Sequence, residues 1–321
     1  MNIVVIGLGS MGKRRIQIVK NLYPGVGIAG VDGREDRRQE AAELFGISCY
    51  ASVSAIEKAD CAFICTAPLS HADLITDCLE RGWHVFTELN LVSDGYDRNM
   101  ALAKEKNCTL FLSSPFFYRE DTRYISAKIT AGRRWNYIYH IGQYLPDWHP
   151  WESYRDFFVG DKRTSGCREI LAVELPWLTG AFGGIASVRA VSDKMTNLDI
   201  AFDDNYMIQI CHQNGSKGVL VVDVVSPVAV RKLEAYGEKA YLLWNGTPDS
   251  ISEYNPDTGQ LEAVMPKEAV EHKEGYRSFI VENAYRNEIN AFFDSIFEDE
   301  APPYGFEQDR QILEIIDSLG A

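Results

Sequence analysis

The sequence predicts an α/β fold in which an N-terminal Rossmann domain, with a doubly wound parallel sheet, precedes a second domain rich in antiparallel strands. A chain of 321 residues is too long for one ordinary hydrophobic core and suits two packed domains. Apolar strands alternate with helical segments as far as Pro115, which is typical of a parallel sheet. Beyond Pro115 the alternation stops, and hairpins such as the one through Asn214-Gly215 follow. We therefore expect a tight domain boundary near residues 115–122.

Composition and charge narrow the class of function. Hydrophobic residues make up 46% and charged residues 24% of the chain, which excludes a disordered or fibrous protein. The net charge of −14 disfavours nucleic acid and anionic membranes as partners. The longest apolar stretch, residues 219–230, is too short to span a bilayer, and the N-terminus lacks the pattern of a signal peptide. Seven scattered cysteines without a C-x-x-C pair indicate reduced thiols, so we expect a cytoplasmic protein.

The first residues carry a dinucleotide-binding motif. A β-branched run, Asn2–Ile6, leads into Gly7-Leu8-Gly9-Ser10-Met11-Gly12, and helical spacing follows from Lys13 to Leu22. The first glycine of such a motif permits a tight turn, the second lets the backbone approach a pyrophosphate, and the third lets helix and strand pack closely. The N–H groups at the helix N-terminus then hold the anion. The predicted contacts in this loop are Gly7, Gly9, Ser10, Met11 and Gly12.

An acidic residue completes the motif. The second strand, Val26–Val31, ends in Asp32, twenty residues after Gly12. A carboxylate here can accept hydrogen bonds from the ribose hydroxyls and repels a 2′-phosphate, so NAD is favoured over NADP. Arg34 leaves NADP open as the alternative, since an arginine just past the acid can neutralise a 2′-phosphate. The basic residues 13–15 leave the same alternative open, although a solvated helix face is the favoured interpretation.

Two later loops are expected to line the nicotinamide half of the site. The strand Ala62–Cys65 leads into the loop 66–70 and the helix His71–Arg81, and the strand Trp83–Phe86 leads into residues 88–90. Ligands bind beyond the carboxyl ends of such strands. The candidate cofactor contacts in these loops are Thr66, Pro68, His71, Glu88 and Asn90.

With these motifs in view, the chain resembles the Gfo/Idh/MocA oxidoreductases, the glucose–fructose oxidoreductase and inositol dehydrogenase family, over nearly its whole length. The resemblance implies a Rossmann domain at 1–118 and an α/β domain with a large open, mainly antiparallel sheet at 119–321. It also implies that a closing helix at about 306–319 packs back on the first domain, and that the open sheet forms a homodimer or homotetramer. The matching segments are the G-x-G-x-x-G, Thr66-Ala67-Pro68-x-Ser70-His71, Gly82–Glu88, Tyr276–Phe297 and Phe306–Leu319.

The chain departs from the family pattern where the chemistry is done. The family's Glu-Lys-Pro reads Glu88-Leu89-Asn90 here, so leucine replaces the lysine that assists proton transfer. The family's aspartate falls on Ile170, or on Glu169 if the register slips by one, and its histidine falls on Glu174. Leucine and isoleucine have no exchangeable proton, so the family's mechanism cannot be transferred unchanged.

Several residues remain as candidates for proton transfer and substrate binding. Glu174 leads because burial could raise the pKa of its carboxyl group; the equal alternative is that it only pairs with Arg168 or another base. Residues 135–158 contain nine aromatic residues, which suit either a sugar platform or simple packing. The dispersed histidines predict no metal site. The candidate catalytic residues are Glu174, Arg168, His149 and Tyr144.

The expected function is NAD(P)-dependent hydride transfer between nicotinamide and a CH–OH group of a sugar, cyclitol or nucleotide-sugar. A role in surface-glycan biosynthesis is suggested by analogy alone. The alternative is a catalytically inactive dinucleotide-binding sensor, scaffold or subunit. A third possibility is a lyase or epimerase that uses NAD transiently.

Overall fold

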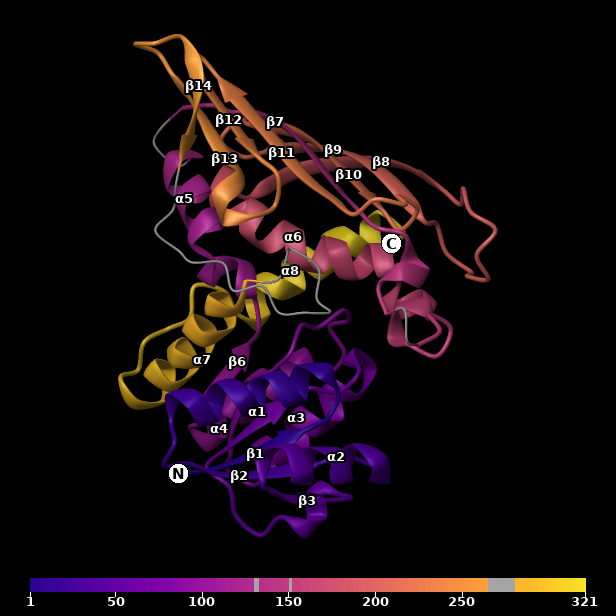
Figure 1. Ribbon diagram of the computed structural model, residues 1–321, viewed down its shortest axis with the longest axis vertical. Coiled ribbons are helices and arrows are strands. Elements are labelled where there is room, and N and C mark those ends of the chain that lie inside the picture. The colour runs from indigo at the N-terminus through magenta and orange to yellow at the C-terminus, as the bar shows by residue number, and fades with distance from the viewer. Residues whose placement is uncertain (130–132, 150–151, 265–280) are drawn as a thin grey trace. The chain divides into compact units, whose positions relative to one another are not determined.

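The chain divides into two compact units (Figure 1). The computed structural model describes residues 1–129, 133–149, 152–264 and 281–321. Unit 1 consists of Met1–Pro115 and Tyr285–Arg310, and unit 2 consists of Phe116–Ala284 and Gln311–Ala321. Each unit is built on its own sheet. In the described part of the chain, none of the helices combines the length and the apolar character needed to cross a membrane.

Unit 1 contains a six-stranded parallel sheet in the order β3-β2-β1-β4-β5-β6, which is the Rossmann order. The predicted doubly wound parallel sheet is confirmed. Its strands are β1 (Asn2–Ile6), β2 (Gly27–Val31), β3 (Ser48–Tyr50), β4 (Cys61–Ile64), β5 (His84–Thr87) and β6 (Leu110–Leu112). Its first four helices are α1 (Ser10–Leu22), α2 (Glu35–Phe45), α3 (His71–Glu80) and α4 (Tyr96–Lys106).

An aromatic cluster fixes a late helix on the sheet of unit 1. Helix α7 (Glu282–Phe297) supplies Phe292 and Phe293, which are buried against rings from β4, β5 and β6. The ring centroids of Phe63 and Phe86 lie 4.9 Å apart, and those of Phe63 and Phe292 lie 5.4 Å apart at a steep angle. Edge-to-face and offset pairs of this kind add to the burial energy. The first part of the predicted helical segment, residues 276–280, lies outside the described residues.

Unit 2 contains an eight-stranded sheet in the order β14-β13-β12-β11-β7-β10-β9-β8. Among the described strands of unit 2, only β7 and β10 are parallel neighbours, so the mainly antiparallel sheet is confirmed. The first four strands are β7 (Asn136–Gly142), β8 (Ile185–Asp193), β9 (Asn205–His212) and β10 (Lys217–Asp223). The others are β11 (Val230–Gly237), β12 (Ala240–Trp244), β13 (Ile251–Asn255) and β14 (Gln260–Val264). Its helices are α5 (Glu120–Ile129), α6 (Gly166–Phe182) and the end of α8 (Phe306–Ser318).

The predicted hairpins form where the turn sequences indicate. Strands β9 and β10 pair through a turn in which Gly215 has a φ of +84°. Strands β13 and β14 form a second hairpin. Strand β8 was not predicted from the sequence. That strand is an edge strand whose side chains are half-buried or exposed on both faces, so it lacks the apolar alternation that identifies a strand.

Helix α6 lies along one face of this sheet (Figure 1). It begins at Gly166, because the Ser165 hydroxyl caps it by accepting the Arg168 N–H. The helix continues through Pro176 as one element. Trp177 packs its ring edge-on against Tyr139 of β7, with centroids 5.7 Å apart.

The opposite face of the sheet is open. No helix covers it within the described residues of unit 2 (Figure 1). Ile138, Met207 and Val219 are exposed there by 47%, 60% and 39%, respectively. Because successive strand residues alternate sides, these apolar side chains lie opposite the buried face that packs on α6.

Candidate functional site

The glycine-rich loop between β1 and α1 has the form that a bound diphosphate needs. Gly7 has a φ of +93°, and a Cβ on Gly12 would lie 1.9 Å from the Gly7 carbonyl oxygen. Only glycine therefore lets α1 begin this close to β1. Gly9 is the N-cap residue of α1 and carries no side chain to cap it. A Cβ on Gly9 would meet the Arg37 guanidinium at 3.5 Å and no closer atom, so its main chain is open to a ligand.

Asp32 lies at the end of β2, next to this loop. One carboxylate oxygen accepts the Leu8 N–H at 2.8 Å, and the other accepts the Arg34 N–H at 2.9 Å. These bonds fix the carboxylate beside the loop while each oxygen keeps a second lone pair for a hydroxyl donor. The open main chain at Gly9 and the fixed acid thus fit the diphosphate and the adenosine ribose of NAD.

The structure places four other predicted cofactor contacts in different environments. Ser10 is exposed, and Met11 is half-buried with its sulfur 3.6 Å from Arg14 Nη1. Pro68 is buried at the start of a short 3₁₀ turn, Pro68–Ser70. Arg34 binds the exposed Asp36, and its Nε lies 3.1 Å from that carboxylate.

A buried histidine holds the loop after β4. His71 Nε2 lies 2.9 Å from the Thr66 carbonyl oxygen, and Nδ1 lies 2.6 Å from Oδ1 of Asn90. Burial lowers the pKa of His71, so the ring is neutral and has one N–H. Both neighbouring atoms are oxygens that accept, so the neutral ring donates its single N–H to one of them, from whichever nitrogen carries the proton. The loops after β4 and β5 are thereby joined.

A buried ion network holds Glu88. The Arg15 side chain is fully buried, and its guanidinium donates to Glu88 through Nε at 2.6 Å and to Glu288 of α7 through Nη2 at 2.7 Å. Burial alone would lower the pKa of Arg15, but the two carboxylates together raise it. Glu288 also accepts the Ser114 N–H at 2.6 Å. Glu88 is therefore fixed at the end of β5 by residues that the sequence motifs did not identify.

Glu174 is fully buried in α6, and both of its carboxylate oxygens are occupied. One oxygen accepts the Tyr139 hydroxyl and the Trp177 indole N–H, each at 2.7 Å. The other accepts Nε and Nη2 of Arg231 at 3.0 and 2.7 Å. These contacts are those of a buried, fully paired ion pair. The partner of Glu174 is Arg231, whereas Arg168 binds Asp317 at 2.7 Å and the Ala321 carbonyl oxygen at 2.7 Å.

Glu169, one turn earlier on α6, has a different environment. Its Oε2 is buried and has no hydrogen-bond partner within the described residues. Desolvation raises the pKa of Glu169 to about 7. A carboxyl group with such a pKa can accept and return a proton near neutral pH. The sequence analysis reached this position only as an alternative register for the family's aspartate.

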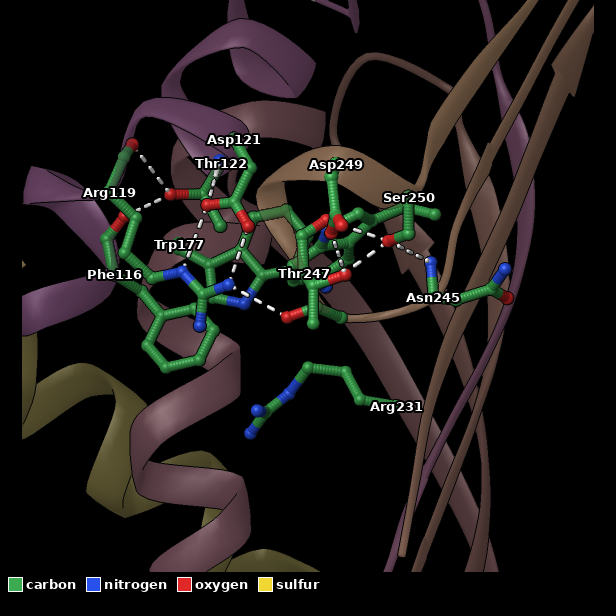
Figure 2. A network of polar contacts seen from close by, with 12 residues as sticks. Phe116, Arg119, Asp121, Thr122, Trp177, Arg231, Asn245, Thr247, Asp249 and Ser250 are labelled. Carbon is green, nitrogen blue, oxygen red and sulfur yellow. Dashed lines mark hydrogen bonds and ion pairs between the residues drawn. The ribbon is translucent and has the colours of Figure 1, made fainter. Parts of the chain in front are cut away.

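Two arginine side chains lie near the Phe116 ring (Figure 2), and one of them, Arg231, is the ion-pair partner of Glu174. The guanidinium groups of Arg119 and Arg231 lie 4.8 and 4.9 Å from the centre of the Phe116 ring. Arg119 is held by Asp121, with Nε 2.9 Å from the carboxylate, and by the Gly246 carbonyl oxygen at 2.8 Å. The sequence carried no signal for this cluster, because Arg119 and Arg231 are 112 positions apart and belong to no motif.

The remaining candidates lie in the segment between β7 and α6. The ring of His149 packs on Phe157 with centroids 4.2 Å apart, and its Nδ1 lies 3.6 Å from Glu152. Tyr144 is half-buried. Trp151 of the aromatic segment lies outside the described residues. Among those described, no group of three or more His, Cys, Asp or Glu side chains is placed to hold a metal ion.

Comparison with known proteins agrees with the site in unit 1. Residues 1–114 match the Gfo/Idh/MocA model, which describes an oxidoreductase family with an NAD-binding Rossmann fold. The N-terminal domain is a Gfo/Idh/MocA domain. The predicted family resemblance is thus confirmed, and so is the predicted cofactor, NAD. Myo-inositol 2-dehydrogenase of Thermotoga maritima is 27% identical over 132 residues, which is 40% of this chain and 40% of that protein.

Solved structures resemble the chain over almost its full length. A levoglucosan dehydrogenase in complex with NADH and levoglucosan has a TM-score of 0.79 at 17% identity, covering 99% of this chain and 96% of that one. UDP-N-acetylglucosamine 3-dehydrogenase of Acidithiobacillus ferrooxidans has a TM-score of 0.75 at 16% identity, covering 99% and 96%. An Agrobacterium radiobacter oxidoreductase in complex with NAD⁺, L-tartaric acid and magnesium has a TM-score of 0.80 at 14% identity, covering 99% and 95%. At these identities the likeness establishes the fold alone.

Proposed function

We propose that this Gfo/Idh/MocA protein is an NAD-dependent oxidoreductase that acts on a CH–OH group of a sugar, cyclitol or nucleotide-sugar. The observation that carries the proposal is the open main chain at Gly9 beside the fixed carboxylate of Asp32. The substrate class is supported by the names of the relatives, which are dehydrogenases of myo-inositol, levoglucosan and UDP-N-acetylglucosamine. NAD, when bound, accepts or supplies the hydride.

The proton that accompanies the hydride needs a group on this chain, since Leu89 stands where the family has lysine. We assign this role to Glu169, because its buried Oε2 has no hydrogen-bond partner among the residues that the structure describes and its pKa lies near neutrality. Glu174 is the alternative base, but its four hydrogen bonds favour a structural role for it as the partner of Arg231. Arg168, His149 and Tyr144 are proposed to position the substrate.

Turnover by paired variants tests this assignment. The absorbance of NADH at 340 nm is followed with NAD⁺ or NADH and a panel of sugars, cyclitols and their keto forms. We expect the wild type to turn over, E169Q to lose at least about 100-fold in kcat, and the pH dependence near pH 7 to disappear with it. If E169Q retains the wild-type pH profile while a folded E174Q loses turnover, Glu174 is the base.

The replacement of the family's lysine by Leu89 favours a second candidate, an inactive dinucleotide-binding sensor or subunit. Tight NADH binding with no turnover of any substrate in the panel would support it. An epimerase or lyase with transient NAD use would convert substrate without a net change in NADH, so product analysis by mass spectrometry and NMR is run beside the absorbance assay.

We also propose that the open face of the unit 2 sheet binds a second copy of the chain in a homodimer or homotetramer. Exposed apolar side chains on this face, such as Met207, support the proposal. Light scattering tests it: a particle of 36.1 kDa, the mass of one chain, would contradict it. A reducing, cytoplasmic location is proposed because all seven cysteines are free in the structure.

A further inference from the structure

Three arginines follow Asp32, and the structure separates their roles. The Arg34 side chain is 60% exposed and binds Asp36, so its charge is directed to the surface. Arg38 donates through Nη1 to the carbonyl oxygens of Asp32 and Gly33 at 2.8 and 2.9 Å, which fixes the turn after β2. Neither guanidinium is bonded to the carboxylate that would hold the adenosine ribose.

Arg37 is the arginine that reaches this carboxylate. Its Nη1 lies 3.7 Å from Oδ2 of Asp32. The same nitrogen would lie 3.5 Å from a Cβ on Gly9, so the guanidinium is also next to the open main chain of the loop. Its side chain is 35% exposed, so it can meet a ligand. The carboxylate predicted to discriminate against a 2′-phosphate therefore has a cation beside it.

The basic residues of α1, which kept NADP open in the sequence analysis, are engaged elsewhere. Lys13 binds Glu40 at 2.6 Å, and Arg14 lies over the Tyr285 ring at 5.0 Å. Arg15 is fully buried between Glu88 and Glu288. Of the basic residues near the dinucleotide site, Arg37 is therefore the one placed to affect the choice between NAD and NADP.

We propose that Arg37 moderates the selectivity for NAD over NADP, by countering the charge of Asp32 and binding a 2′-phosphate. The proposal rests on the dinucleotide site of the proposed function. Asp32 keeps NAD the preferred cofactor, since its carboxylate still accepts the ribose hydroxyls. Arg37 makes this preference moderate, because a guanidinium pairs with phosphate in a charge-assisted manner. NADP then binds more weakly than NAD, but measurably.

Calorimetric titration of the full chain with NADH and NADPH tests the proposal without an enzyme assay. We expect the wild type to bind NADPH within about 100-fold of NADH, and R37A to weaken NADPH by about 10-fold or more while changing NADH by less than about 3-fold. R37K should keep part of the NADPH affinity, because it retains the charge. R98A is the control and should change neither affinity, since its guanidinium is 52% exposed and binds Asp73. Thermal melts confirm that each variant is folded.

Each other outcome overturns the proposal. NADPH that fails to bind at concentrations where NADH saturates would show that Asp32 alone sets the selectivity. Equal losses of NADH and NADPH in a folded R37A would make Arg37 a general contact of the dinucleotide. If neither cofactor binds the wild type, the dinucleotide site itself is wrong, and the proposed function falls with the inference.

Discussion

Glu169 and Glu174 lie five residues apart on helix α6 and have opposite electrostatic environments. The Glu174 carboxylate is fully paired by Tyr139, Trp177 and Arg231. The Glu169 carboxyl keeps a buried oxygen without a partner among the described residues, and desolvation raises its pKa to about 7. One glutamate thus stabilises the fold as an anion, while the other is neutral below pH 7 and costs stability when it ionises.

The first prediction concerns the stability of E169Q as a function of pH. The folded-state pKa of Glu169 lies above the unfolded value of 4.5, so its favourable contribution is present at acidic pH and is lost as the pH rises through about 7. E169Q cannot ionise and should be more stable than the wild type at pH 8, by about 1–3 kcal/mol, with little difference at pH 4.5. Urea unfolding at the two pH values measures this. A variant that is no more stable than the wild type at pH 8 would contradict it.

Loss of the Glu174 carboxylate should destabilise the protein. E174Q removes the buried carboxylate that pairs with the Arg231 guanidinium, so we expect a loss of about 3–5 kcal/mol in the free energy of unfolding. D77N is the control, because it removes an exposed i,i+4 pair with Arg81 and should cost no more than about 0.5 kcal/mol. Equal stability of E174Q and D77N at pH 7 would show that the Glu174 pair is not structural.

Alanine substitutions in the glycine-rich loop should separate folding from binding. A Cβ on Gly9 would lie 3.5 Å from its nearest atom, Nη1 of Arg37, so G9A should fold with a nearly unchanged melting temperature. Its methyl group nevertheless occupies the main-chain surface that a diphosphate approaches, and we expect NADH affinity to fall by at least about 100-fold. G33A, whose Cβ meets no atom within 4 Å, is the control and should bind normally. Normal binding by G9A would place the diphosphate elsewhere.

Asn90 offers a test of the nicotinamide half alone. Asn90→Ala removes the amide that bonds to His71 and should loosen the loop after β4. We expect NADH affinity to fall about 10-fold and the affinity for ADP-ribose, which lacks the nicotinamide, to change less than about 2-fold. Asn21→Ala on the exposed side of α1 should alter neither. A parallel loss of both ligands would mean that the loop contacts the adenosine half.

The sequence predicted those parts of the protein that depend on local patterns. The glycine spacing and the acid at the end of β2 identified the dinucleotide site, because backbone conformation there requires particular residues at fixed distances along the chain. The hairpin through Asn214-Gly215 was predicted for the same reason.

The features that could not be predicted from the sequence depend on contacts between residues that are distant along the chain. Arg15 and Glu288 are 273 positions apart, and Arg231 and Glu174 are 57 apart, so no motif could link them. Glu169 and Glu174 could not be distinguished by residue type, since only packing shows which carboxylate finds partners. Strand β8 was missed because its side chains are half-buried or exposed on both faces.

Calorimetric titration of NADH into the purified chain tests most directly whether Gly9 and Asp32 hold a dinucleotide. We expect saturable binding at about one molecule per chain with a micromolar Kd, and its loss in G9A. Absence of heat at millimolar NADH and NAD⁺ from a folded wild type would contradict the dinucleotide site and the proposed oxidoreductase activity.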